Sequence, residues 1–147
     1  MNAADKAELL IRKRVREEDD VKLLNKRTYG IFRRMSADAK ELSRLAEIDF
    51  TVEELRAWSQ RLRGMECSWC SRVLKSKDIS WDHKIPVSRG GSYGKDNLAG
   101  ICKVCNGQKG SLTLDEFARL RECLRTLAKE AKTDILRRLG LGARWRS

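Results

Sequence analysis

The sequence predicts an α+β protein that is mainly helical, with a short β-hairpin held by a zinc site of four cysteines. One proline and 6% aromatic residues in 147 argue for helices over a β-sandwich or barrel. Apolar residues recur every three or four positions before residue 64 and after residue 113, as they do along amphipathic helices. Between these regions glycines cluster, and the period at which apolar residues recur shortens to two. We therefore expect a helical N-terminal extension at 1–66, a core at 67–112, and a C-terminal helix with a basic tail at 113–147.

The N-terminal extension is expected to contain three helices. Apolar residues at helical spacing define the first over 21–35, and Ser36 is placed to cap a second that ends near residue 45. Thr51 and Glu54 fit a capping box, in which a hydroxyl and a carboxylate bind the free N–H groups at a helix start. A glycine at position 64 is expected to end this third helix.

A strand and a long helix are expected after the extension. The segment 79–85 alternates between apolar and polar residues, which predicts a β-strand that a proline ends. Thr113 and Glu116 repeat the capping box, and the apolar residues that follow predict one long helix that stops near Gly140. Cys123 falls among these apolar residues, so we expect its thiol to be buried or half-buried.

The charge of the chain indicates an anionic partner. It has 32 Lys+Arg against 21 Asp+Glu, a net charge of +11 and a pI of about 9.8. Much of the excess lies in 67–112, which contains eight Lys+Arg, three Asp and no Glu. No stretch approaches the roughly 18 apolar residues of a membrane span, and the first residues lack the apolar segment of a signal peptide. We therefore expect a cytoplasmic protein that binds a polyanion and no membrane.

Four of the five cysteines form two C-x2-C pairs, Cys67 with Cys70 and Cys102 with Cys105. Each pair can place two thiolates on one ion, and two pairs complete the tetrahedron that structural zinc prefers. The 31 residues between the pairs must fold as a hairpin to bring them together. A site closed by four sulfur ligands has no open position, so this zinc is expected to stabilise the fold and not to react.

The only histidine, His83, lies between the cysteine pairs and directly after Asp82. A single histidine is often an ordinary surface or core residue. Its place beside a carboxylate, in a basic segment enclosed by the zinc ligands, favours a functional role.

Together these residues resemble the motif of the HNH nuclease family. The resemblance covers residues 67–110 and implies a ββα-metal core, in which a β-hairpin and a helix surround a catalytic metal. The third motif letter, often histidine, is Asn106 here, so the sequence is similar to an H-N-N variant whose amide oxygen can also ligate a hard cation. The shared positions are Cys67, Cys70, Asp82, His83, Pro86, Gly90, Gly91, Asn97, Leu98, Cys102, Cys105, Asn106, Lys109 and Gly110.

The resemblance implies a role for each polar residue of the motif. His83 is expected to be the general base, because neutral imidazole can take a proton from water near pH 7. Asp82 and Asn106 are expected to hold one Mg²⁺ or another divalent cation, whose remaining ligands are water and substrate phosphate. Asn97 is expected to brace the loop and orient His83. Strand alternation would put Asp82 and His83 on opposite faces, so we expect the pleat to break at this pair.

Four basic residues are expected to contact nucleic acid, and the resemblance makes DNA the expected partner. Arg89 and Lys109 are predicted phosphate contacts, and Arg144 and Arg146 flank a tryptophan in the basic tail. The resemblance extends to small phage proteins, some near packaging functions, which implies a packaging or recombination partner and the host cytoplasm. The apolar stripe at 21–35 offers a surface for a homodimer through the N-terminal helices.

Three functions remain open at this point. The first, which we predict, is a metal-dependent endonuclease that hydrolyses or nicks DNA with His83 as general base. The second is a non-catalytic zinc module that binds nucleic acid, which needs the cysteines and the positive charge but has no use for Asp82, His83 or Asn106. The third is an interaction protein whose helical N-terminus recruits a partner while the nuclease-like core is inert.

Overall fold

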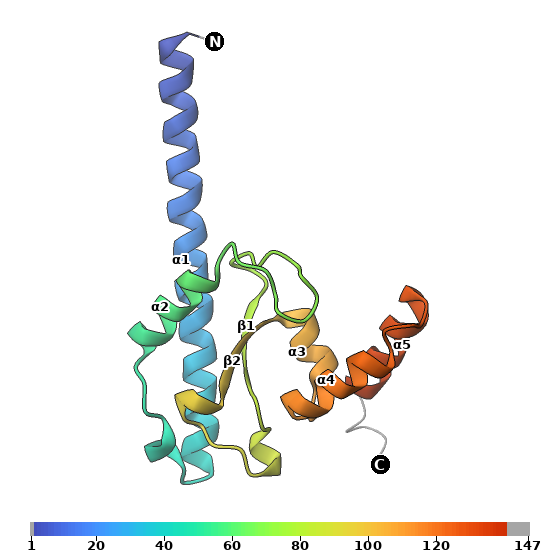
Figure 1. Ribbon diagram of the computed structural model, residues 1–147. Helices are drawn as coiled ribbons and strands as arrows, with labels where there is room; N and C mark the ends of the chain where they lie inside the picture. The colour runs from blue at the N-terminus through green and yellow to red at the C-terminus, as the bar shows by residue number, and fades with distance from the viewer. Residues whose placement is uncertain (1, 141–147) are drawn as a thin grey trace.

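The computed structural model describes residues 2–140 and confirms a mainly helical α+β fold. In that part of the chain the one sheet has two antiparallel strands, and Figure 1 shows it between the long helix α1 and the shorter helix α3. Three short 3-10 turns lie at 45–47, 87–89 and 95–97. The main elements are α1 (Ala3–Glu41), α2 (Val52–Leu62), β1 (Ile79–His83), β2 (Leu98–Cys102), α3 (Lys103–Lys109), α4 (Leu114–Cys123) and α5 (Lys129–Gly140).

The helix α1 is continuous over 39 residues, where the sequence predicted two shorter helices. Ser36 lies in its interior and does not start a new helix. The residues around Ser36 include no glycine or proline that would break the helix. Met35 and Ala39 are both buried on the same side, so the apolar stripe continues past Ser36. The helix ends at Glu41, just before Ser43 adopts a φ of +56°.

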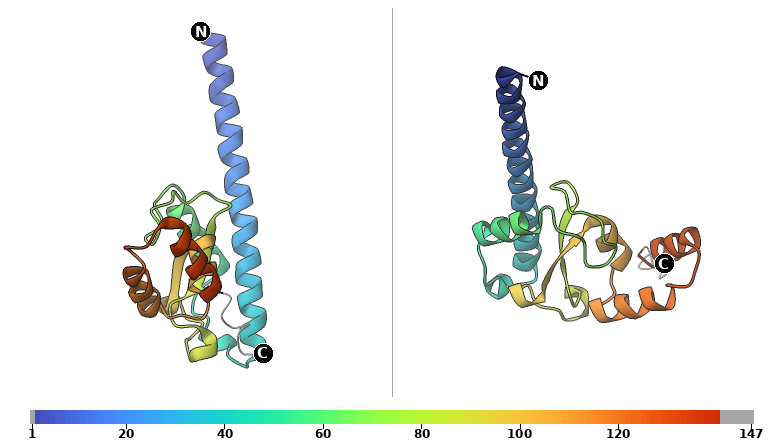
Figure 2. Two further views of the ribbon diagram at one scale, coloured as in Figure 1. Left: turned by 90° about the vertical axis from the view of Figure 1, so that its right-hand side faces the viewer. Right: turned by 45° about the horizontal axis from the view of Figure 1, so that its top comes forward.

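The N-terminal half of α1 stands clear of the rest of the chain (Figure 1, Figure 2). Residues 3–19 are exposed, among them Leu10 at 66% and Ile11 at 63%. Leu24 and Met35, in contrast, are buried in the chain's own core. The stripe at 21–35 is thus occupied within the molecule, so it does not offer the dimer surface that the sequence predicted. None of the described helices is both long and apolar enough to cross a membrane.

The predicted C-terminal helix is two helices, α4 and α5. The break between them lets α5 turn back onto α3, where Leu136 is 2% exposed. Leu127, which the sequence placed in the apolar stripe, lies in the break and is 41% exposed. Cys123 at the end of α4 is exposed and not buried as expected.

Both predicted capping boxes are present. Thr51 Oγ1 accepts a hydrogen bond from the Glu54 N–H at 3.2 Å, and the Glu54 carboxylate accepts one from the Thr51 N–H at 2.7 Å. Thr113 and Glu116 make the same two bonds. These bonds satisfy N–H groups that have no acceptor within the first turn, so α2 and α4 begin where the sequence predicts.

Two buried clusters join the N-terminal helices to the core. The first brings Leu24 of α1 together with Ile79 and Ile101 of the two strands and with Phe117 of α4. The second combines residues of α1 and α2 with Tyr93 and Leu98 of the core, so the extension and the core pack together through both clusters. The buried members of the second cluster are Met35, Ala39, Phe50, Leu55, Tyr93 and Leu98.

The strand β1 ends at His83, two residues earlier than predicted. The ladder runs unbroken to the pair of His83 and Leu98. The expected break in the pleat is therefore wrong, and the side chains of Asp82 and His83 point to opposite faces. Trp81, on the same face as His83, packs against the α1–α2 cluster, whereas Asp82 faces α3.

We expect Leu55→Ala to lower the free energy of unfolding by about 2–5 kcal/mol, because Leu55 of α2 is 0% exposed and packs in the second cluster. Leu10→Ala is the matched control, since the same change at an exposed position should alter that free energy by about 0.5 kcal/mol or less. Urea unfolding followed by circular dichroism measures both variants. Equal costs would contradict the packing of α2 on α1.

Candidate functional site

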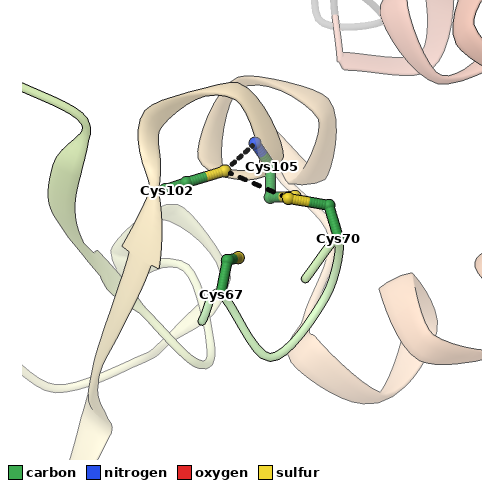
Figure 3. Close-up of side chains that lie close together, drawn as sticks. All are labelled: Cys67, Cys70, Cys102 and Cys105. Atoms are coloured by element: carbon green, nitrogen blue, oxygen red, sulfur yellow. Dashed lines mark hydrogen bonds between the residues drawn. The ribbon is translucent and has the colours of Figure 1, made fainter. Parts of the chain in front are cut away.

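The four predicted zinc ligands lie together (Figure 3). Their Sγ atoms are all within 4.8 Å of one another, and those of Cys70 and Cys102 are 3.7 Å apart. A tetrahedral zinc ion with Zn–S bonds of about 2.3 Å keeps its sulfur ligands about 3.8 Å apart. The Cys105 N–H donates to Cys102 Sγ at 3.3 Å. The cluster of Cys67, Cys70, Cys102 and Cys105 therefore fits a structural zinc ion.

Burial and backbone N–H groups have opposite effects on these thiols. Burial disfavours the thiolate of Cys67, but hydrogen bonds from backbone groups outweigh it and lower the pKa of Cys67 to about 7. Burial raises the pKa of Cys105. A bound dication favours the thiolate form of all its cysteine ligands, so the enclosed sulfur atoms suit a metal better than four free thiols.

The cysteine cluster fixes the position of α3. Cys102 ends β2 and is the N-cap of α3, and Cys105 lies in the first turn of that helix. Cys67 and Cys70 belong to the turn that precedes the hairpin. Since Asn106 directly follows Cys105, the cluster also determines where the Asn106 side chain emerges beside β1.

Asn106 contacts the face of β1 that carries Asp82. Its Nδ2 donates to Ser80 Oγ at 2.7 Å. Ser80 and Asp82 are two residues apart on the strand, so their side chains share one face. The amide nitrogen of Asn106 is engaged by this bond, which leaves the amide oxygen as the end of the side chain that can ligate a cation.

Lys109, one helical turn after Asn106, is buried against Asp82. Its Nζ lies 2.7 Å from Asp82 Oδ2 and donates to the His83 backbone oxygen at 3.0 Å. The Lys109 side chain is 0% exposed. Asp82 Oδ2 is buried and lies against this ammonium, which balances its charge. The Asp82 side chain is 20% exposed, so it is not fully enclosed by the ion pair.

His83 projects from the other face of β1 and packs edge-to-face on Tyr93, with ring centroids 5.3 Å apart at 86°. Burial lowers the pKa of His83 from its ordinary value of 6.5; the charge of Asp82 opposes this, while Lys109 and Arg44 act in the same direction as burial. The ring is therefore neutral at pH 7. Its Nε2 atom is buried and has no hydrogen-bond partner among the described residues.

A cavity of about 320 Å³ joins His83 and Asn106. They lie on different sides of the hairpin, but a two-stranded sheet leaves β1 with a free edge, around which groups from both faces can meet. Asp82 is not in the wall of this cavity. The wall consists of Ile31, Arg34, Met35 and Asp38 of α1, Ser80, Trp81 and His83 of β1, Val87 and Tyr93 of the loop, and Asn106 of α3.

Asn97 closes the loop between the strands. Its Oδ1 accepts from the Ile85 N–H at 2.9 Å, and its Nδ2 donates to the carbonyls of Ile85 and Ser92 at 2.9 and 2.8 Å. A Cβ at Gly91 would lie 1.8 Å from the Ile85 carbonyl oxygen, so only glycine allows the loop to close this tightly. Because Ser92 precedes Tyr93, these bonds also hold the ring on which His83 packs.

The predicted phosphate contacts are engaged elsewhere. Arg89 forms an ion pair with both carboxylate oxygens of Glu116, one of them at 2.8 Å, and donates to the Ser111 carbonyl. Lys109 is buried with Asp82 and offers no atom to a phosphate. We therefore revise the expected roles of Arg89 and Lys109 to internal ion pairs. The predicted contacts of Arg144 and Arg146 lie outside the described residues.

Arg34, Asp38 and Tyr93 were missed by the sequence analysis, although all three line the cavity. Arg34 and Asp38 could have been found from their spacing, since each lies three residues after a residue of the apolar stripe, Ile31 or Met35. Nothing in the sequence marks Tyr93 as the packing partner of His83.

Residues 67–120 match a family model described as HNH endonuclease. The matched segment begins at the first zinc ligand and includes the hairpin, α3 and most of α4. No curated protein matches the chain significantly. The match, the β-β-α order and the four-cysteine cluster together support the assignment of residues 67–120 to the HNH endonuclease family, which implies a nuclease-type function in general.

Proposed function

We propose that the protein is a metal-dependent DNA endonuclease that hydrolyses or nicks phosphodiester bonds in the cavity shared by His83 and Asn106. The observation that carries this proposal is the state of His83: a neutral ring with an unpartnered, buried Nε2 that belongs to a residue of the cavity wall. No described residue occupies this nitrogen, and groups of this kind are expected at catalytic sites.

In the proposed reaction His83 acts as the general base. The imidazole takes a proton from water, the water oxygen forms a bond to phosphorus, and the bond between phosphorus and the 3′-oxygen breaks. The 3′-oxygen takes a proton from solvent, and the imidazolium of His83 returns its own proton to solvent. Atoms and charges balance without a further reactant.

Asp82 and Asn106 would hold the divalent cation, each through an oxygen atom. When bound, Mg²⁺ supplies positive charge that stabilises the phosphate and the leaving oxygen. One feature supports this assignment: the side chains of both residues stand between β1 and α3.

Asn97 and Tyr93 are proposed to position the base. Asn97 holds the backbone next to Tyr93, and the Tyr93 ring restricts the orientation of His83. Neither residue needs to touch the substrate for this role. Asn97 thus keeps the bracing role predicted for it and acts on His83 through Tyr93.

The two rival functions use fewer of these features. A non-catalytic zinc module would bind nucleic acid through the positive charge of the chain and would have no use for the buried nitrogen of His83. An interaction protein would use the exposed half of α1, whose Leu10 and Ile11 face solvent. A partner or a second copy on that segment is compatible with cleavage, and the homodimer expected through the N-terminal helices stays a prediction. The packaging or recombination partner likewise stays a prediction.

We expect the purified protein to hold one zinc ion per chain, and Cys105→Ser to lose most of it, because the tetrahedron then lacks one thiolate. Zinc content by atomic absorption and the melting temperature measure the effect, and cleavage should be lost together with the fold. Cys123→Ser is the matched control, since Cys123 is exposed and outside the cluster. A folded, fully active Cys105→Ser protein would contradict the structural role.

We expect wild-type protein with Mg²⁺ to convert supercoiled plasmid to nicked or linear forms, and His83→Ala to do so about 10²–10⁴-fold more slowly, as is typical for the loss of a general base. Equal zinc content and circular dichroism spectra of the two proteins exclude misfolding. Intact plasmid over a range of enzyme and metal concentrations would eliminate the catalytic function. Equal rates for both proteins would remove His83 from the role of base.

We expect chelation to stop cleavage and added Mg²⁺ to restore it in protein that retains its zinc. Asn106→Ala should raise the Mg²⁺ concentration for half-maximal cleavage by at least about tenfold, because even the loss of outer-shell partners weakens metal sites that much. Gln108→Ala is the control, since it removes another amide of α3 that does not line the cavity. The same Mg²⁺ requirement in both variants would exclude Asn106 as a ligand.

A further inference from the structure

The wall of the cavity is completed by a segment outside the family match. The match covers residues 67–120, yet four wall residues belong to α1. They recur at helical spacing, so one face of α1 lies along the cavity. Among the described residues, Arg34 is the only one that brings a positively charged side chain to the cavity wall.

A phosphodiester that enters this cavity needs a positive partner besides the metal ion. The residues that the sequence offered for this purpose are not free, because Arg89 is paired with Glu116 and Lys109 is buried with Asp82. Arg34 differs from both. Its side chain is exposed, and it forms no ion pair or side-chain hydrogen bond with any residue from 2 to 140.

The surroundings of Arg34 leave its guanidinium free to bind a ligand. Its Nη1 atom would lie 3.6 Å from a Cβ at Gly30, one turn back on α1, so the guanidinium lies beside the helix and not in the core. Asp38, one turn forward on the same wall, is the only acidic residue that lines the cavity in the described chain, and its charge acts on His83. No ion pair joins Arg34 and Asp38 in the described structure, so the guanidinium keeps all its donors for a ligand.

We propose that Arg34 binds a backbone phosphate of the nucleic-acid substrate in the cavity that contains His83 and Asn106. A guanidinium presents a planar fork of N–H donors that matches two phosphate oxygens, which an ammonium does not. This assignment rests on the proposed nuclease function. It adds that substrate binding needs α1, so that the helical extension supplies part of the nuclease site.

The test compares Arg34→Gln with Arg33→Gln. Arg33 is the neighbouring arginine of α1, exposed and absent from the cavity wall, so both variants lose one positive charge from the same helix. Two measurements are made with each: the rate of plasmid cleavage with Mg²⁺, and the binding of a labelled DNA duplex in EDTA at several salt concentrations. Zinc content and melting temperature show whether the fold is intact.

We expect Arg34→Gln to lower kcat/KM by about 10–100-fold, the effect of a hydrogen bond to a charged group. For DNA binding by this variant, the slope of log K against log salt concentration should be shallower by about one, which corresponds to the loss of one phosphate contact. Arg34→Lys should recover only part of the rate, and Arg33→Gln should stay close to wild type.

If wild type cleaves DNA while the two glutamine variants behave alike, Arg34 is not a phosphate contact and the nuclease function stands. If wild type binds DNA without cleaving it, the nuclease function fails, and the binding data alone decide whether Arg34 contacts a phosphate. If wild type neither binds nor cleaves DNA, both proposals fall.

Discussion

The closure of four sulfur atoms around one point is the constraint on which the rest of the site depends. It joins the turn that carries Cys67 and Cys70 to the junction of β2 and α3, two segments about 30 residues apart in the sequence. Because Cys105 is a member, the first turn of α3 cannot rotate without breaking the cluster. Asn106 therefore stays against β1, and the orientation of α3 also decides which of its later residues face the strand.

The second consequence of that orientation is the burial of Lys109. It lies one turn beyond Asn106 and neutralises Asp82 between β1 and α3, where either charge alone would be costly. The same ammonium donates to the His83 carbonyl, so one buried cation contacts the backbone of the proposed base and the side chain of a proposed metal ligand. The two faces of β1 therefore differ. The face toward α3 carries the ion pair, and the other face carries the imidazole, which is directed toward Tyr93 and α1.

Features fixed by local chemistry could be predicted from the sequence. The C-x2-C pairs, the capping boxes and the strand before Pro86 depend on residues within a few positions of one another. Features fixed by long-range packing could not. The continuity of α1 past Ser36 and the break between α4 and α5 depend on which apolar residues pack in the core. The ion pairs of Arg89 and Lys109 are of the same kind, since their partners are 27 residues away along the chain. The sequence identified these two residues as basic, but their availability to a phosphate is a tertiary property.

The position of α1 follows from contacts that hold the extension on the core. Asp20 accepts hydrogen bonds from Arg63 at 2.9 Å and from Ser76 at 2.6 Å, which bind α1 to the segment around the first cysteines. Leu62 of α2 packs onto β2 at Gly100, where a Cβ would lie 2.2 Å from Leu62 Cδ1. With these contacts in place, the lower half of α1 must run along the hairpin face that carries His83. The wall formed by α1 is therefore a consequence of how the whole chain packs, and the motif alone does not make a complete cavity.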